Sequence, residues 1–228
     1  MKTIIHIGQH KTGTTSIQKF LQMKNKEFSD QGLYVPKSIL KFDNSSHFLL
    51  NVYALNKNRY SSMKEHLAKI EPETFFESLE ENLKNDIEGH YKKAHQDGCK
   101  EVIWSNEGLY LLNSTEEYQR LYDLFAKYSD EITCICCFRE ISSYRQSYMN
   151  QLLKQKLTFS EEKDSYKYIA EDSWLFDYER KKRLLKSVFK DNVEYLDYDA
   201  NDMVNIFISK LGYTIVDNDG IRLNISKT

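Results

Sequence analysis

The sequence has little proline and little glycine: two prolines and eight glycines among 228 residues. It accordingly contains no linker rich in proline, glycine or serine, and we find no internal repeat and no low-complexity tract. A chain of this length buries one substantial core, whereas a second domain would have little core of its own. We therefore expect a single domain over residues 1–228.

Long hydrophobic runs and an excess charge of one sign are also missing. No apolar segment approaches the ~20 residues that span a bilayer, and the formal net charge is −2. So small a net charge gives no sign of a broad nucleic-acid-binding surface. The chain starts with a predicted strand and lacks the basic and apolar stretches of a secretory leader. We expect no transmembrane segment, no nucleic-acid partner and a cytoplasmic location.

Cysteine is scarce, and its placement argues against a metal centre. Three of the four cysteines, Cys134, Cys136 and Cys137, lie in an apolar stretch typical of a central strand. Side chains alternate between the two faces of a strand, so these three thiols cannot converge on one ion. Cys99 stands alone. We expect buried free thiols, with no zinc site or redox pair and no metal.

Short apolar runs alternate with longer helical patterns, which indicates β-α units around a parallel sheet. The predicted strands cover 3–8, 33–35, 101–105, 132–138 and 193–197. The predicted helices cover 14–28, 115–128, 141–157, 176–190 and 201–211, with two or three more in 46–70 and 73–97. Ligands of open parallel sheets bind beyond the carboxyl ends of the strands. The loops 8–16, 36–48, 105–110 and 139–147 should therefore line one site.

The most informative stretch is the loop after the first predicted strand, Gly8-Gln9-His10-Lys11-Thr12-Gly13-Thr14-Thr15-Ser16. Two glycines allow its backbone to turn back and approach an anion. The hydroxyls that follow stand at a helix N-terminus, which favours phosphate. The glycine spacing matches the nucleotide-triphosphate P-loop, but the lysine is displaced: position 14 is threonine, and Lys11 lies inside the loop. A magnesium triphosphate is therefore not implied.

A second pattern follows the predicted strand 132–138. Arg139 comes directly after this strand, and Ser147 lies eight residues further on, two turns into the next predicted helix. A guanidinium at a strand end and a hydroxyl on the neighbouring helix can converge on one phosphate.

Together the two segments resemble the sulfotransferase family that uses 3′-phosphoadenosine 5′-phosphosulfate, and most of all its bacterial branch related to carbohydrate sulfotransferases. His10-Lys11-Thr12-Gly13-Thr14-Thr15 matches the family's 5′-phosphosulfate loop, and the Arg139–Ser147 pair matches its 3′-phosphate signature. The resemblance and the alternation of strands and helices predict an α/β fold. The expected architecture is a P-loop-NTPase-like three-layer sandwich, with a central, mostly parallel sheet flanked by helices.

The resemblance also implies roles for individual residues. Lys11 would stabilise the negative charge that grows on the oxygen bridging phosphate and sulfate. The 5′-phosphate would be held by Thr12, Gly13, Thr14, Thr15 and Ser16, and the 3′-phosphate by Arg139 and Ser147. His10, inside the loop, can contact phosphate or acceptor. No metal is required, because lysine and backbone amides supply the positive charge.

The sequence departs from the family pattern at one position and adds a candidate contact at another. Small-molecule sulfotransferases carry a tryptophan after the Thr-Thr pair that stacks on adenine, whereas here the residue is Ser16. The adenine-stacking residue is therefore unassigned. Near the C-terminus, Arg222 resembles a residue of the phosphate-side closing loop, and a solvated tail residue is an equal alternative.

A base must take the proton from the acceptor hydroxyl, and two residues are candidates. Glu107 follows the strand 101–105, and its placement resembles that of the glutamate base of heparan-type sulfotransferases. His47 opens a predicted helix, and small-molecule sulfotransferases use a histidine base. The acceptor, by resemblance, is a hydroxyl on a saccharide or glycoconjugate, and the helical stretch 46–97 is expected to cover the acceptor side.

Two other functions compete with sulfuryl transfer. A nucleotide kinase or NTPase of the P-loop type needs a lysine at position 14, where this chain has threonine. A non-catalytic module that binds a phosphonucleotide predicts binding of a 3′,5′-diphosphate without turnover on any acceptor. Replacing Glu107 by Gln distinguishes the two hypotheses. An enzyme should lose transfer activity, whereas a non-catalytic module has no such activity to lose.

Overall fold

The computed structural model of the protein describes residues 1–42 and 46–215 and has a five-stranded, all-parallel sheet in the order β2-β3-β1-β4-β5. The strands are β1 (Lys2–Gly8), β2 (Leu33–Tyr34), β3 (Glu101–Ser105), β4 (Glu131–Phe138) and β5 (Val193–Asp197). They match the predicted strands closely. Strands β1, β3 and β4 are mostly apolar runs that are buried in the sheet, whereas the edge strand β5 is only partly buried. The first strand occupies the centre.

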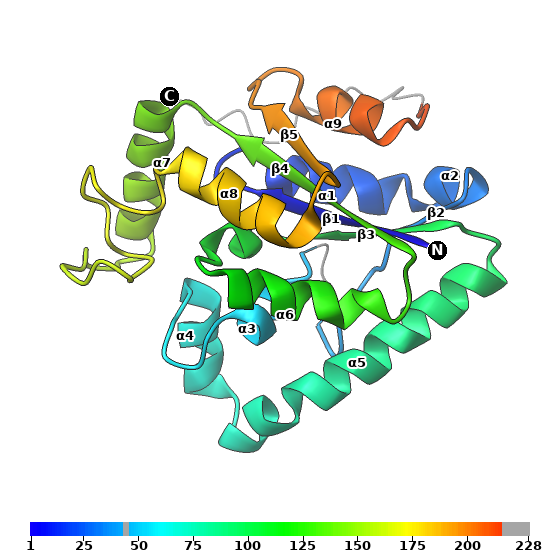
Figure 1. The fold of residues 1–228 in the computed structure, drawn as a ribbon, viewed down its shortest axis with the longest axis horizontal. Helices are drawn as coiled ribbons and strands as arrows, with labels where there is room; N and C mark the ends of the chain where they lie inside the picture. The colour runs from blue at the N-terminus through cyan, green and yellow to red at the C-terminus, as the bar shows by residue number, and fades with distance from the viewer. Residues whose placement is uncertain (43–45, 216–228) are drawn as a thin grey trace.

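Helices cover both faces of this sheet (Figure 1). On one face lie α1 (Thr14–Met23), α2 (Asn25–Asp30) and α9 (Met203–Leu211). The elements that follow β2, β3 and β4 are mostly on the other face: α3 (Leu49–Ala54), α4 (Ser62–Ile70), α5 (Glu73–Gln96), η1 (Glu107–Leu111), α6 (Thr115–Ala126) and α8 (Tyr178–Phe189). The result is a three-layer α/β sandwich, as the sequence predicts.

Strand β1 shows how the alternation of side chains builds the two cores. Ile5 and Ile7 are buried in the core beneath α6 and α8, whereas Ile4 is buried in the core beneath α1 and α9. The cysteines of β4 divide in the same way, with Cys134 and Cys136 in one core and Cys137 in the other. All four cysteines are buried free thiols, which confirms the prediction.

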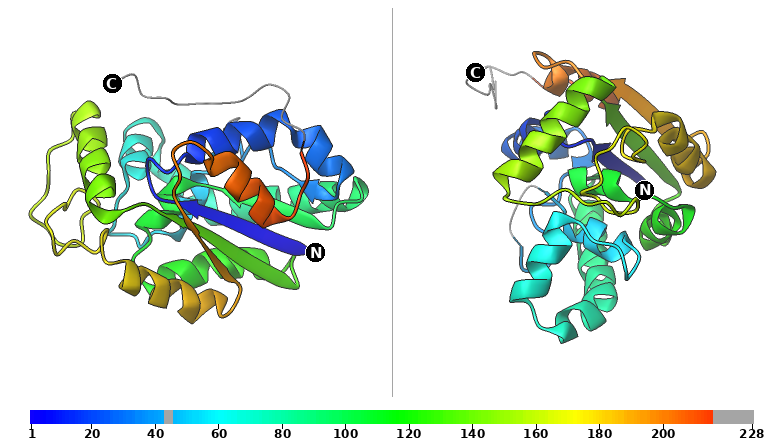
Figure 2. Two further views of the ribbon diagram at one scale, coloured as in Figure 1. Left: turned by 90° about the horizontal axis from the view of Figure 1, so that it is seen from above. Right: turned by 90° about the vertical axis from the view of Figure 1, so that its left-hand side faces the viewer.

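All five strands point in one direction, so the loops that follow them meet at one edge of the sheet. Helix α7 (Ile141–Lys154) stands at this edge, beyond the end of β4 (Figures 1 and 2). In the described part of the chain, no helix is long and apolar enough to cross a membrane. The same residues include no group of three or more His, Cys, Asp or Glu side chains that could hold a metal ion.

Candidate functional site

The loop between β1 and α1 is tightly folded. Lys11 and Gly13 both adopt left-handed backbone conformations, with φ of 68° and 75°. The Thr12 hydroxyl donates to the carbonyl oxygen of Gln9 at 2.6 Å, which closes the turn from inside. Gly13 precedes α1 and brings no capping side chain to it. The first turn of α1 therefore presents backbone amides and the positive end of the helix dipole to an anion.

Gly8 is required by this packing. A Cβ atom at position 8 would lie 2.5 Å from the Thr14 hydroxyl and 3.2 Å from the Thr12 hydroxyl. The loop therefore folds directly over the end of β1, with the Thr12 and Thr14 side chains buried beneath it. Lys11 and Thr15 are exposed instead. Of the predicted loop contacts, Lys11 is thus free to swing toward a ligand, whereas Thr12 and Thr14 shape the backbone.

Arg139 lies beside this loop. Its Nη1 donates to the carbonyl oxygen of Lys11 at 3.1 Å, so the guanidinium lies against the backbone of the loop. Its Nε donates to the Ser143 hydroxyl at 2.8 Å, one turn into α7. Ser147 is the next residue on the same helix face, because residues four apart along a helix are neighbours. The structure thus places Ser143 against Arg139, with Ser147 one turn further along the same face of α7.

Sequence reasoning missed two residues that contact the Arg139 side chain, Ser143 and Tyr198. Ser143 has a local signal, since it lies four residues after Arg139 and four before Ser147. Tyr198 follows β5 and has no such signal. Its ring faces the Arg139 guanidinium, with 5.0 Å between the guanidinium carbon and the ring centre. It also lies 4.0 Å from the Cβ position of Gly13, so it borders both segments.

Glu107 begins η1 at the same edge of the sheet. The backbone N–H of Asn106 donates to the carbonyl oxygen of His6 in β1 at 3.1 Å, which fixes the start of this turn beside the loop. The Gln18 side-chain amide, on α1, donates to a carboxylate oxygen of Glu107 at 3.2 Å. Gln18 is a further residue that the sequence did not single out. Glu107 is only partly buried, so its carboxylate remains accessible to an acceptor.

His10 is buried next to these charges, and its Nδ1 has no hydrogen-bond partner among the described residues. Burial lowers the pKa of His10, the Glu107 carboxylate raises it and the Lys11 ammonium lowers it, with burial the largest effect. The ring is therefore neutral near pH 7. The His10 ring makes an edge contact with the Tyr148 ring of α7, at 5.3 Å between ring centres. His10 therefore packs the loop against that helix.

His47 lies against the end of β3 and has a different environment. Its Nδ1 accepts the Ser105 backbone N–H at 2.9 Å, and its Nε2 is 3.1 Å from the carbonyl oxygen of Pro36, to which it donates. Burial lowers its pKa to about 4. Both ring nitrogens are committed to backbone groups, which favours a structural role over that of a base. The other predicted contact, Arg222, lies outside the described residues.

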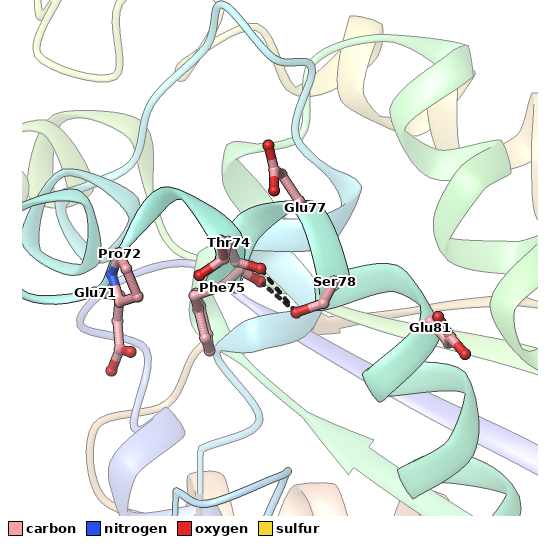
Figure 3. Close-up of a pocket in the computed structure, with 7 residues that line it drawn as sticks. All are labelled: Glu71, Pro72, Thr74, Phe75, Glu77, Ser78 and Glu81. Carbon is pink, nitrogen blue, oxygen red and sulfur yellow. Dashed lines mark hydrogen bonds between the residues drawn. The ribbon is translucent and has the colours of Figure 1, made fainter.

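A surface hollow of about 570 Å³ lies where α4 meets α5, away from the loop after β1 (Figure 3). Its lining includes Glu71, Glu77 and Glu81. Three carboxylates repel phosphate groups, so this hollow does not suit the ligand that the loop favours.

No protein-family model and no curated protein matches the sequence. Among solved structures, the fold is similar to a sulfotransferase from Alicyclobacillus acidocaldarius, with a TM-score of 0.52 and 15% identity over 96% of this chain and 88% of that one. It is also similar to the sulfotransferase domain of the Synechococcus PCC 7002 olefin synthase, with a TM-score of 0.50 and 14% identity over 95% of this chain and 74% of that one. The chain thus has an α/β fold that sulfotransferases use, which confirms the predicted fold class.

Proposed function

We propose that this protein is a sulfotransferase that moves a sulfuryl group from 3′-phosphoadenosine 5′-phosphosulfate to an acceptor hydroxyl. One observation carries the proposal: the loop containing Lys11 and the strand end containing Arg139 meet, joined by the bond from Arg139 Nη1 to the Lys11 carbonyl at 3.1 Å. The Arg139 guanidinium thus lies against the backbone of the loop that carries Lys11. The two segments can therefore contribute cationic groups to one ligand that has two separate phosphate groups. The sulfotransferase fold of the chain agrees with this function.

The residues of the site suit both anionic ends of such a donor. The left-handed turn at Gly13 and the uncapped start of α1 form a backbone cradle for the 5′-phosphate. The side chains of Arg139, Ser143 and Ser147 offer charge-assisted hydrogen bonds to the 3′-phosphate. Lys11, exposed above the cradle, can neutralise the charge that develops on the leaving phosphate oxygen.

Glu107 is the proposed base. Its partly buried carboxylate stands at the same strand edge as the loop, and Gln18 holds one of its oxygens. A carboxylate in this place can accept the acceptor proton as the oxygen attacks sulfur in line with the leaving group. The neutral His10 beside it offers a second proton acceptor or a hydrogen bond to the acceptor hydroxyl. By resemblance, the acceptor is a saccharide or glycoconjugate and transfer requires no metal. We propose a cytoplasmic location for the protein.

The proposal is tested by transfer of ³⁵S-labelled sulfuryl groups from the donor to a panel of saccharides and other hydroxyl compounds. We expect Lys11→Ala to lower the turnover number roughly 10²- to 10³-fold and Glu107→Gln to lower it roughly 10²- to 10⁴-fold. Lys19→Ala and Glu116→Gln are matched controls, because both residues are exposed on helices outside the site. Equal turnover numbers for wild type, Lys11→Ala and Glu107→Gln would contradict the catalytic roles assigned to Lys11 and Glu107. Donor binding without transfer to any acceptor would favour a non-catalytic module.

A further inference from the structure

Gln9, the residue between the end of β1 and the displaced lysine segment, has a fully buried side chain. Its Oε1 accepts the backbone N–H of Arg139 at 2.7 Å. Its Nε2 donates to the Tyr110 hydroxyl at 3.0 Å. The amide thus bonds the loop after β1 to the end of β4 and to η1 at the same time. Both ends of the amide are used, so its orientation is fixed.

The backbone of Arg139 is held from its other side as well. The Tyr178 hydroxyl, at the start of α8, donates to the Arg139 carbonyl oxygen at 2.6 Å and lies 3.4 Å from Gln9 Oε1. Both backbone polar groups of Arg139 therefore have hydrogen-bond partners within the protein. These bonds hold the backbone in place and leave the side chain to bind a ligand. The Tyr110 hydroxyl in turn donates to the Leu175 carbonyl at 3.0 Å, which anchors the far end of the amide.

We propose that Gln9 is a positioning residue that fixes the spacing between the phosphate-binding loop 8–16 and Arg139. In this role it makes the site selective for nucleotides with two separate phosphate groups over nucleotides with one. The inference rests on the proposed function, because it assumes that the loop and Arg139 bind opposite ends of one ligand. A buried amide suits the task, since breaking its bonds leaves the Arg139 N–H without a partner inside the protein.

The test compares the affinities of adenosine 3′,5′-diphosphate and 5′-AMP by titration calorimetry. A charge-assisted contact to the second phosphate should make wild type prefer the diphosphate roughly tenfold to a hundredfold. Gln9→Met keeps a flexible side chain of similar length but makes no hydrogen bonds. We expect it to reduce this preference to roughly threefold or less while 5′-AMP affinity changes little.

Gln22→Met is the matched control. Gln22 also donates its amide to a backbone oxygen, that of Pro36 at 2.7 Å, but it connects neither Arg139 nor the loop. This variant should lose stability without losing the preference for the diphosphate. A role of Gln9 in stability alone would make the two glutamine variants behave alike. If Gln9→Met does not fold, Tyr178→Phe tests the same support and should lower the preference in part.

The possible outcomes separate the two proposals. If wild type prefers the diphosphate and Gln9→Met and Tyr178→Phe both keep the full preference, the inference on Gln9 is overturned and the proposed function stands. If wild type binds the two nucleotides equally, the proposed donor is wrong and the inference on Gln9 is overturned with it. In the Arg139→Ala background, Gln9→Met should cause no further loss of preference, and an additive loss would contradict the positioning role.

Discussion

Gly8 is the residue at which one added methyl group should disturb the loop most. A Cβ atom there would lie 2.5 Å from the Thr14 hydroxyl, which belongs to the first turn of α1. Gly8→Ala must therefore displace the Thr14 side chain from the end of the strand. We expect this overpacking to cost roughly 1–3 kcal/mol in the free energy of unfolding. Denaturant unfolding measures the cost, and nucleotide titration should show weaker binding.

Gly89→Ala is the control for this prediction. Gly89 is exposed in the middle of α5, and a Cβ atom there would meet nothing within 4 Å. Alanine is the better helix former, so this variant should gain about 0.5–1 kcal/mol. If Gly8→Ala and Gly89→Ala both change the free energy of unfolding by a small and equal amount, the loop does not pack tightly over β1.

Sequence reasoning found residues whose chemistry is visible next to a predicted strand end, and it missed those that depend on distant partners. Lys11, Glu107 and Arg139 follow predicted strands and can be read locally. Gln9 gives no such signal, because its main partner is 130 positions away in the chain. His47 has the opposite problem: its residue type suits a base at neutral pH, but the fold commits both ring nitrogens to backbone groups.

At the scale of elements, the sheet was predicted well and some helix boundaries were not. The prediction of one helix over 14–28 is wrong, because α1 ends at Met23 and α2 begins at Asn25. Lys24 between them leaves the helical conformation, with ψ at 18°. The break allows Phe28 to pack fully buried, with its ring against that of Phe20. Neither glycine nor proline marks the place, so local propensity could not reveal it.

Helix α8 is tied to η1 by a buried lysine, and this contact predicts a pH effect. Lys181 donates to the carbonyl oxygens of Tyr110 and Leu112 and to the Tyr118 hydroxyl. Burial lowers the pKa of Lys181 to about 7, from about 10.5 when exposed. Between pH 7 and pH 10.5, Lys181 is protonated in the unfolded chain but largely neutral in the folded chain. This lysine therefore makes the free energy of unfolding rise with pH in that range.

Lys181→Met removes this titration and keeps the volume of the side chain. We expect the stability of wild type relative to this variant to increase between pH 7 and pH 10, by at most about 1.4 kcal/mol per pH unit. Lys186→Met, on the exposed side of the same helix, is the control and should show no such trend. Denaturant unfolding across this pH range is the measurement. A difference that stays constant with pH would show that Lys181 titrates normally.

For the molecule as a whole, the arrangement of elements separates the proposed anion site from the acidic hollow between α4 and α5. Lys11 and Arg139 stand at the carboxyl edge of the sheet, whereas the glutamates of the surface hollow lie at the end of α4 and along α5. The loop after α7 contacts α4 through the pair Lys167–Glu65, at 2.9 Å. The stretch 46–97 therefore reaches the loop after α7, and its place on the acceptor side stays a prediction.

The central claim is that one site binds a nucleotide through two separate phosphate groups, at the loop after β1 and at Arg139. Calorimetric titration with adenosine 3′,5′-diphosphate in metal-free buffer, beside ATP with Mg²⁺, tests this claim most directly. We expect wild type to bind the diphosphate without metal, and Arg139→Ala to bind it roughly tenfold to a hundredfold more weakly. Binding of magnesium ATP alone, or no binding of the diphosphate at millimolar concentration, would contradict the claim.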